Sequence, residues 1–182
     1  LAACGRQASD VKAVGIGYQM HGLVVLDKQG KVLRPSIIRC DSRAVDVGDD
    51  IYRALGENYC REHLLNAPGN FTASKLHWVD IYESEVYEKT AVFMLPGDYL
   101  AYRLTGLAGT TQSGLSEGIL WDFKNHALPE KMLSLLGINP DIIPIIFPTF
   151  GIQGLVTKTA ATETGLPEGI PITYRAGDQP NN

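Results

Sequence analysis

The stretch VGIGYQMHGLVVLD, residues 14–27, predicts two apolar strands separated by a polar interruption. The aliphatic and β-branched residues on each side are typical of buried strands. A simple hairpin would place Asn-Gly or Asp-Gly at the junction, whereas this chain has Gln19, Met20 and His21 between two glycines. His21 is either a turn or core histidine or a histidine that hydrogen-bonds a ligand hydroxyl, and the residues alone leave both interpretations open.

The last predicted strand, IPITYRAGDQ at residues 170–179, ends in Gly-Asp-Gln. Ligands of α/β sheets gather at the carboxyl edge of the strands, where Asp178 can accept a proton or hold a polyol hydroxyl. Aspartate is also a common turn residue, and turn formation alone explains it equally well. A ligand role for Asp178 is therefore one of two interpretations.

Helical and strand-like patterns alternate between these two stretches, which predicts an α/β domain with a mixed β-sheet flanked by helices. Residues 27–30, Asp-Lys-Gln-Gly, predict a hairpin turn because glycine tolerates a positive φ. Pro96 suits the first turn of one helix, and Gly106 suits the position after its last turn. Further helices are predicted over 40–56, 58–65, 72–85, 128–138 and the second half of 150–169, whose first half predicts a strand.

Several side chains have expected structural roles. Asp41 or Ser42 is expected to cap the helix that follows, and Thr72 is expected to cap the helix over 72–85. Lys75 on that second helix is expected to be solvated. The segment from 107 to 128 is rich in Gly, Ser and Thr, which predicts a long ordered loop or an irregular β region.

Composition excludes several classes of protein. The chain has 182 residues, and its net charge of −4 argues against a nucleic-acid or anionic-membrane surface, since both require a basic patch. No apolar run approaches the roughly 20 residues of a membrane span. There is no initiating Met, and the chain stops just after a strand, so we expect an internal piece of a longer protein.

Cysteine and histidine patterns give no sign of a metal site. The histidines share no metal-ligand spacing with acidic residues, so no metal site is predicted. An odd number of cysteines without a CxxC pair predicts neither a zinc site nor a disulfide framework and favours a cytoplasmic location. Each of the three is expected to be a small buried apolar residue, namely Cys4, Cys40 and Cys60.

Five motifs taken together resemble one family, the FGGY carbohydrate kinases. They are YQMHG, CDSRA, FTASKLHW, LPGDYLAYRLTG and YRAGDQPNN, and their order and spacing fit most of residues 11–182. The QMHG motif is most similar to the xylulose kinase branch. The resemblance implies an actin-like, ribonuclease-H-like fold of two domains, in which sugar binds the N-terminal domain and ATP binds mainly the C-terminal one.

On this resemblance, residues 1–182 would form most of the N-terminal sugar-binding domain. The family's first phosphate-loop hairpin would lie upstream and its ATP-binding domain downstream, so the piece alone should not turn over ATP. The implied activity is phosphorylation of a pentulose with ATP and Mg²⁺, D-xylulose to D-xylulose 5-phosphate being favoured. Ribulose, gluconate or glycerol as substrate, or a non-catalytic sugar-binding actin-like protein, are the alternatives. The expected partners are the sugar and ATP, without nucleic acid or membrane, and a homodimer is one of the open oligomeric states.

The resemblance also implies roles for individual residues. Asp178 falls on the family's catalytic base, which takes the proton of the sugar hydroxyl that attacks the γ-phosphate. Arg39 departs from the family, which usually has an aromatic residue there, and this puts the sugar identity in doubt. The residues expected to bind substrate are Met20, His21, Asp41, Asn70, Asp178 and Gln179.

Overall fold

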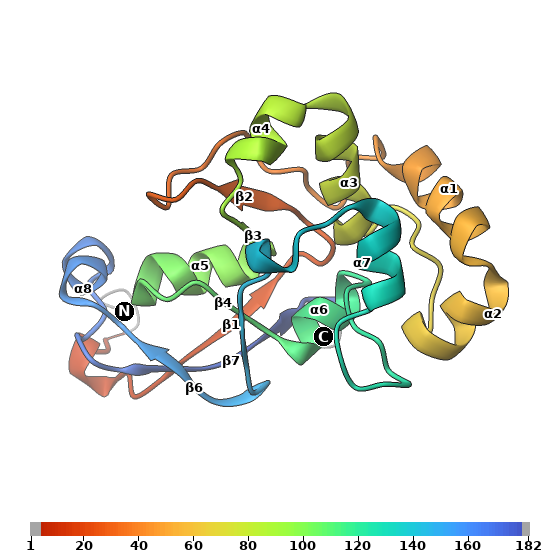
Figure 1. The fold of residues 1–182 in the computed structure, drawn as a ribbon. Helices are drawn as coiled ribbons and strands as arrows, with labels where there is room; N and C mark the ends of the chain where they lie inside the picture. Colours follow the sequence, from red (N-terminus) through yellow and green to blue (C-terminus); the bar gives the residue numbers. More distant parts are fainter. Residues whose placement is uncertain (1–4, 180–182) are drawn as a thin grey trace.

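The computed structural model describes residues 5–179 of the chain as alternating helices and short strands (Figure 1). The strands are β1 (Val14–Tyr18), β2 (Val24–Leu26), β3 (Val92–Met94), β4 (Gly109–Thr111), β5 (Ile145–Phe147), β6 (Phe150–Leu155) and β7 (Pro171–Gly177). The α-helices are α1 (Val45–Leu55), α2 (Glu57–Tyr59), α3 (Thr72–Tyr82), α4 (Ser84–Lys89), α5 (Pro96–Thr105), α6 (Gln112–Glu117), α7 (Glu130–Leu136) and α8 (Lys158–Thr164). Short 3₁₀ turns at Ala8–Asp10 and Pro140–Ile142, and a π-helical turn at Cys60–Leu64, complete the set.

The main sheet has the strand order β1-β7-β6. β1 runs parallel to β7, and β6 runs antiparallel to β7, so the predicted mixed sheet is confirmed. Tyr18, the last residue of β1, is paired with Gly177, the last residue of β7. Two segments about 160 residues apart in sequence therefore leave the sheet side by side at the same edge.

The strands on either side of the Gln19–His21 interruption do not pair with each other. β2 instead pairs antiparallel with β3, and β4 pairs parallel with β5. The predicted turn at 27–30 is confirmed, since Gly30 has φ +76° and its N–H donates to the Asp27 carbonyl at 2.9 Å. The interruption is thus a junction between two sheets rather than a hairpin loop.

Helix α5 covers the main sheet and contacts β1, β7 and β6, with α8 packed beside it (Figure 1). It begins at Pro96 and ends before Gly106, which has φ +74°, as the sequence predicts. Tyr18 lies against Gly97 so closely that a Cβ at that position would overlap the Tyr18 ring. This close approach fixes the end of β1 against the first turn of α5.

A buried ion pair joins α5 to the sheet. The Arg175 Nε of β7 lies 3.3 Å from Asp98 Oδ1, and both side chains are only 1% exposed. The other Asp98 oxygen accepts the Leu95 N–H at 3.3 Å, at the start of α5. Burial raises the pKa of Asp98 to about 6, although the Arg175 charge opposes that shift.

Helices α1, α3, α4 and α7 gather on the side of the molecule away from the main sheet (Figure 1). They enclose the largest apolar core, to which α3 contributes Leu76 and Val79, both fully buried. Tyr82, at the end of α3, does not join this core and is 64% exposed. Trp78 packs against the same core from its rim, beneath the Arg43 guanidinium.

Both predicted side-chain caps are wrong. α1 begins only at Val45, without a side-chain cap, and Asp41 pairs with Arg43 instead. The Thr72 hydroxyl donates to the Gly22 carbonyl at 3.2 Å, because the start of α3 is packed against the 19–22 junction and its hydroxyl faces that backbone.

Two further expectations need correction. The segment over 107–128 contains β4 and α6, which apolar periodicity could not reveal because α6 is short and mostly polar. Cys60 is buried as expected, Cys40 is exposed in a surface loop, and Cys4 lies outside the described residues.

Among residues 5–179, no helix is long and apolar enough to cross a membrane.

Candidate functional site

The ends of β1 and β7 bring Asp178 and Met20 together. The Asp178 N–H donates to the Tyr18 carbonyl at 2.7 Å, which continues the parallel ladder one residue past the sheet. The Met20 N–H then donates to Asp178 Oδ1 at 3.3 Å. The backbone of the polar interruption therefore orients the carboxylate that ends the last strand.

His21 is held in a strained but well-supported conformation. Its φ of +63° lies in the left-handed region, which is costly for a residue with a Cβ. Its Nδ1 lies 2.9 Å from the Glu117 carbonyl oxygen, and its ring packs edge-on against Phe71 with centroids 4.3 Å apart. Burial lowers the pKa of His21. A carbonyl only accepts, so the neutral ring carries its proton on Nδ1 and keeps Nε2 as an acceptor.

Lys75 of α3 supports the left-handed turn at His21, a role that the sequence did not predict. The side chain was expected to be solvated, but it is fully buried. Its Nζ donates to the His21 carbonyl at 2.7 Å and to the Ile38 carbonyl at 3.0 Å. Burial lowers the pKa of Lys75 to about 8. The ammonium group thus ties the left-handed turn to the segment that precedes Arg39.

Replacing Lys75 with methionine should destabilise the fold, because the carbonyls of His21 and Ile38 would lose a buried donor. We expect a loss of about 1–3 kcal/mol in the free energy of unfolding. Urea denaturation measures it, with Lys158→Met on the exposed first turn of α8 as the control, expected within about 0.5 kcal/mol of the parent. A loss no larger than that of the control would show that the buried ammonium does not support the turn.

A cavity of about 440 Å³ opens beside this turn, a size usual for small-molecule sites. Met20 and His21 form one wall, and Gly177 of β7 lies next to them. Ser113, Ser116 and Glu117 of α6 supply further polar groups, while the apolar part comes mainly from Leu64, Leu65, Phe71, Ile119 and Phe123. Asp178 does not line the cavity itself; it lies at the rim, next to Gly177 and bonded to Met20.

Glu117 is a second carboxyl group at this cavity that sequence reasoning missed. It ends α6, and burial raises its pKa to about 8. Its Oε1 is buried without a hydrogen-bond partner among the described residues. The only available signal was its place in a Gly- and Ser-rich segment, which gives no hint that it faces Met20 and Gly177.

Gly177 is required where the two walls meet. A Cβ added there would overlap Met20 Cγ and would lie 2.6 Å from Glu117 Oε2. The glycine of the Gly-Asp-Gln sequence therefore lets both side chains reach the edge of β7. Gln179 follows as an exposed residue, and its Nε2 donates to Asp178 Oδ2 at 3.4 Å.

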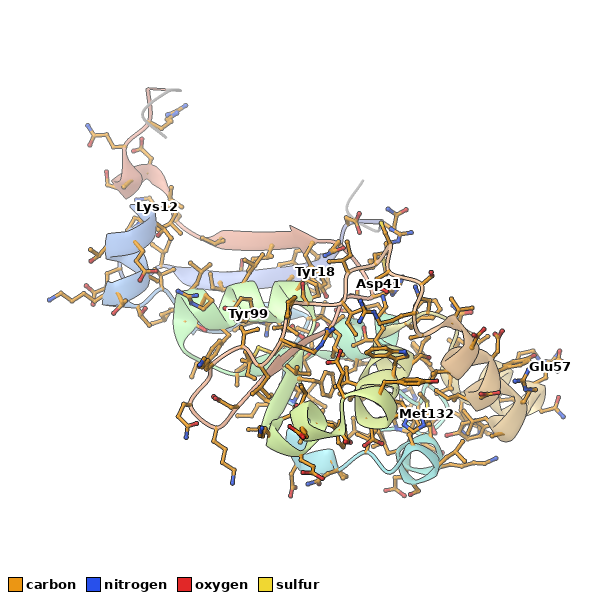
Figure 2. The ribbon with its side chains drawn as sticks, turned by 90° about the horizontal axis from the view of Figure 1, so that it is seen from above. Lys12, Tyr18, Asp41, Glu57, Tyr99 and Met132 are labelled. Carbon is orange, nitrogen blue, oxygen red and sulfur yellow. The ribbon has the colours of Figure 1, made fainter. Side chains whose placement is uncertain are left out.

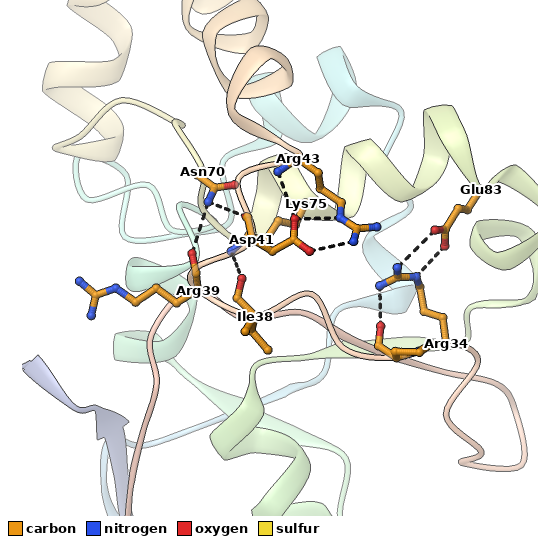
Figure 3. A network of polar contacts seen from close by, with 9 residues as sticks. Arg34, Ile38, Arg39, Asp41, Arg43, Asn70, Lys75 and Glu83 are labelled. Carbon is orange, nitrogen blue, oxygen red and sulfur yellow. Dashed lines mark hydrogen bonds and ion pairs between the residues drawn. The ribbon is translucent and has the colours of Figure 1, made fainter.

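Asp41 and Asn70 belong to a neighbouring network and do not line the cavity (Figure 3). Asn70 Nδ2 donates to the Asp41 carbonyl at 2.8 Å and to the Arg39 carbonyl at 3.4 Å. The Asp41 carboxylate pairs with Arg43 at 2.8 Å, and the guanidinium holds the pKa of Asp41 below its usual value. In Figure 2, Tyr18 marks the end of β1, and Asp41 lies beyond it. The network therefore adjoins the site.

Arg39 joins this network to the junction through its backbone. Its N–H donates to Gln19 Oε1 at 3.2 Å, while its side chain is exposed and points away from Asp41 (Figure 3). Within residues 5–179 no group of three or more His, Cys, Asp or Glu side chains is placed to hold a metal ion.

A family model described as the N-terminal domain of the FGGY family of carbohydrate kinases matches residues 2–181. The chain belongs to the FGGY family. Among its relatives, the xylulose kinase of Staphylococcus xylosus is 32% identical over 170 residues, which cover 93% of this chain and 35% of the relative. The xylulose kinase of Streptomyces rubiginosus is 35% identical over 181 residues, 98% of this chain and 37% of the relative. The chain thus spans about a third of the length of these FGGY relatives.

Solved FGGY structures share the fold. The xylulose kinase of Rhodospirillum rubrum superposes with a TM-score of 0.84 and 28% identity, covering 92% of this chain and 35% of that one. The glycerol kinase of Plasmodium falciparum with ADP gives a TM-score of 0.83 and 25% identity, over 93% of this chain and 34% of that one. The predicted actin-like, ribonuclease-H-like α/β fold is confirmed.

Proposed function

We propose that the complete protein phosphorylates a pentulose with ATP, converting D-xylulose to D-xylulose 5-phosphate. Residues 1–182 would supply most of its N-terminal sugar-binding domain, with the first phosphate-loop hairpin and the ATP-binding domain supplied by other parts of the protein. The observation that carries this proposal is the Asp178 carboxylate, oriented by the Met20 N–H at the rim of a sugar-sized cavity. The similarity to xylulose kinases over nearly the whole chain supports it.

Asp178 would accept the proton of the sugar hydroxyl that attacks the transferred phosphoryl group. A carboxylate at hydrogen-bond distance from one hydroxyl meets the need of phosphoryl transfer for a positioned proton acceptor. The Met20 N–H holds one carboxylate oxygen in place, so the other can face the substrate. The Gln179 Nε2 donates to that second oxygen at 3.4 Å. When the sugar binds, the Gln179 side chain would either move away from Asp178 or contact the sugar itself.

His21 would bind a different sugar hydroxyl. With Nδ1 fixed to the Glu117 carbonyl, its Nε2 can accept a hydrogen bond from the substrate at neutral pH. Asp41 and Asn70 would act indirectly, because their contacts hold the segment over 39–41 against the junction rather than line the cavity. The geometry thus favours positioning roles for these two residues.

ATP would supply the transferred phosphoryl group, and Mg²⁺ would neutralise its phosphates, as phosphoryl transfer requires. Residues 5–179 contain no group of three or more His, Cys, Asp or Glu side chains that could hold the ion by themselves, whereas Mg²⁺ on a nucleotide is usually held by one or two carboxylates together with the phosphates. No step of the proposal therefore depends on a metal ion held by this part of the chain.

Sugar-stimulated release of ADP by the complete protein tests this proposal. With ATP and Mg²⁺ present, D-xylulose should give the largest kcat/KM in a panel with D-ribulose, gluconate and glycerol. A larger kcat/KM with another sugar would support the kinase activity but show that D-xylulose is not the preferred substrate. Sugar binding without ADP release from any member would instead favour a non-catalytic sugar-binding protein, the alternative suggested by Arg39 in place of the family's aromatic residue.

A further inference from the structure

Glu117 occupies a wall of the cavity that the proposed chemistry leaves unused. Its side chain lines the cavity together with Met20 and Gly177. Its Oε2 lies against the backbone of Gly177, the residue directly before Asp178. Its carbonyl oxygen accepts the His21 Nδ1 proton. One residue at the end of α6 therefore touches the turn and the strand end that form the site.

No described residue satisfies the buried carboxyl oxygen Oε1. A buried polar atom without a partner is costly, so such groups in a binding site are usually paired when the ligand is bound. The Tyr18 hydroxyl and the His21 backbone lie close enough to favour the ionised carboxyl, but burial outweighs both and raises the pKa of Glu117 to about 8. At neutral pH the carboxyl is therefore largely protonated and can donate as well as accept.

We infer that Glu117 is a specificity-determining residue whose carboxyl group hydrogen-bonds a hydroxyl of the bound sugar other than the one that faces Asp178. This inference rests on the proposed sugar-kinase function. The two carboxyl groups have separate tasks, since Asp178 at the open rim takes a proton and Glu117 in the wall recognises a hydroxyl. Lengthening or inverting the sugar at the recognised position would leave a buried carboxyl unpaired, which disfavours the wrong substrate.

Two substitutions in the complete protein test the contact. Glu117→Ala should raise KM for the preferred sugar about 10- to 100-fold, the effect of losing a buried hydrogen bond, with kcat changed less than about threefold. Glu117→Gln should keep KM within about threefold at pH 7, because the amide is neutral and can donate and accept like the acid. Glu168→Gln, at an exposed position, is the matched control and should leave both constants unchanged.

The pH dependence separates recognition from a merely structural role. As the pH rises through about 8, Glu117 loses its proton, so KM of the parent should rise, whereas Glu117→Gln should lack that rise. Lys75, whose pKa is also lowered to about 8, contacts the neighbouring His21 carbonyl, but it titrates in both proteins and does not contribute to the difference. The other titratable and charged groups that face Glu117 are those of Tyr18, His21, Asp98 with its partner Arg175, and Asp178.

The outcomes distinguish this inference from the proposed function. If the parent phosphorylates no sugar of the panel, the proposed function fails, and the inference fails with it. If the parent is active and Glu117→Ala lowers kcat but leaves KM unchanged, only the inference is overturned. Should Glu117→Ala fail to fold, the pH dependence of KM in Glu117→Gln decides. If KM of Glu117→Gln rises through pH 8 as much as KM of the parent does, the inference is overturned.

Discussion

Asp178→Asn in the complete protein is expected to lower kcat for sugar phosphorylation by about 10²- to 10⁴-fold, the usual contribution of a positioned general base. Asparagine keeps the shape of the side chain, and its amide oxygen can still accept the Met20 N–H that now contacts Oδ1. What it loses is the ability to take a proton. Steady-state ADP release at saturating sugar measures the effect.

Sugar affinity should change much less than turnover in Asp178→Asn, because His21 and the cavity walls remain. Isothermal titration with D-xylulose would give a Kd within about tenfold of the parent value. Asp46→Asn, at an exposed position of α1, is the matched control and should retain full activity. Near-normal kcat in Asp178→Asn would remove this residue from the role of base.

The largest effect on stability is expected from Asp98→Asn. This change leaves the Arg175 guanidinium, only 1% exposed, without its counter-charge, although the amide oxygen can still accept the Leu95 N–H. Breaking one partner of a buried ion pair costs about 3–5 kcal/mol. We expect a loss of that size in the free energy of unfolding, measured by urea denaturation at pH 7.5, where the parent Asp98, with a pKa of about 6, is ionised.

Two controls identify the charge as the cause. Asp98→Asn combined with Arg175→Met should recover at least half of the loss, because the double variant buries no unpaired charge. Asp50→Asn breaks an ion pair with Arg53 whose side chains are 70% and 71% exposed, and it should cost no more than about 1 kcal/mol. A loss in Asp98→Asn as small as that in Asp50→Asn would contradict the importance of the buried pair.

Sequence patterns predicted the parts of the fold that local chemistry determines. Pro96 and Gly106 delimit α5 as expected, because their preferred backbone geometries leave few alternatives. Thr72 and Lys75 were assigned wrongly for a common reason. Apolar periodicity identifies only the side of α3 that packs on the large core, whereas its first turn also faces the backbone at Gly22 and His21. That second contact depends on tertiary packing.

The candidate site was predictable to a similar extent. Gly-Asp-Gln at a strand end and a polar interruption after another strand each suggested a ligand edge, and parallel pairing of β1 with β7 brings them together. The pattern could not reveal Glu117, because a six-residue helix in a Gly- and Ser-rich segment has no periodicity that orients its last side chain. Nor could it show that Asp41 faces Arg43 rather than the cavity, since loop geometry determines that contact.

A crystal structure of the complete protein with bound D-xylulose would decide whether Asp178 is the proton acceptor. We expect the sugar in the cavity beside Met20, His21 and Gly177, with one hydroxyl oxygen about 2.6–3.2 Å from an Asp178 carboxylate oxygen. Sugar bound productively at another place, with the Asp178 carboxylate out of reach of every hydroxyl, would contradict it.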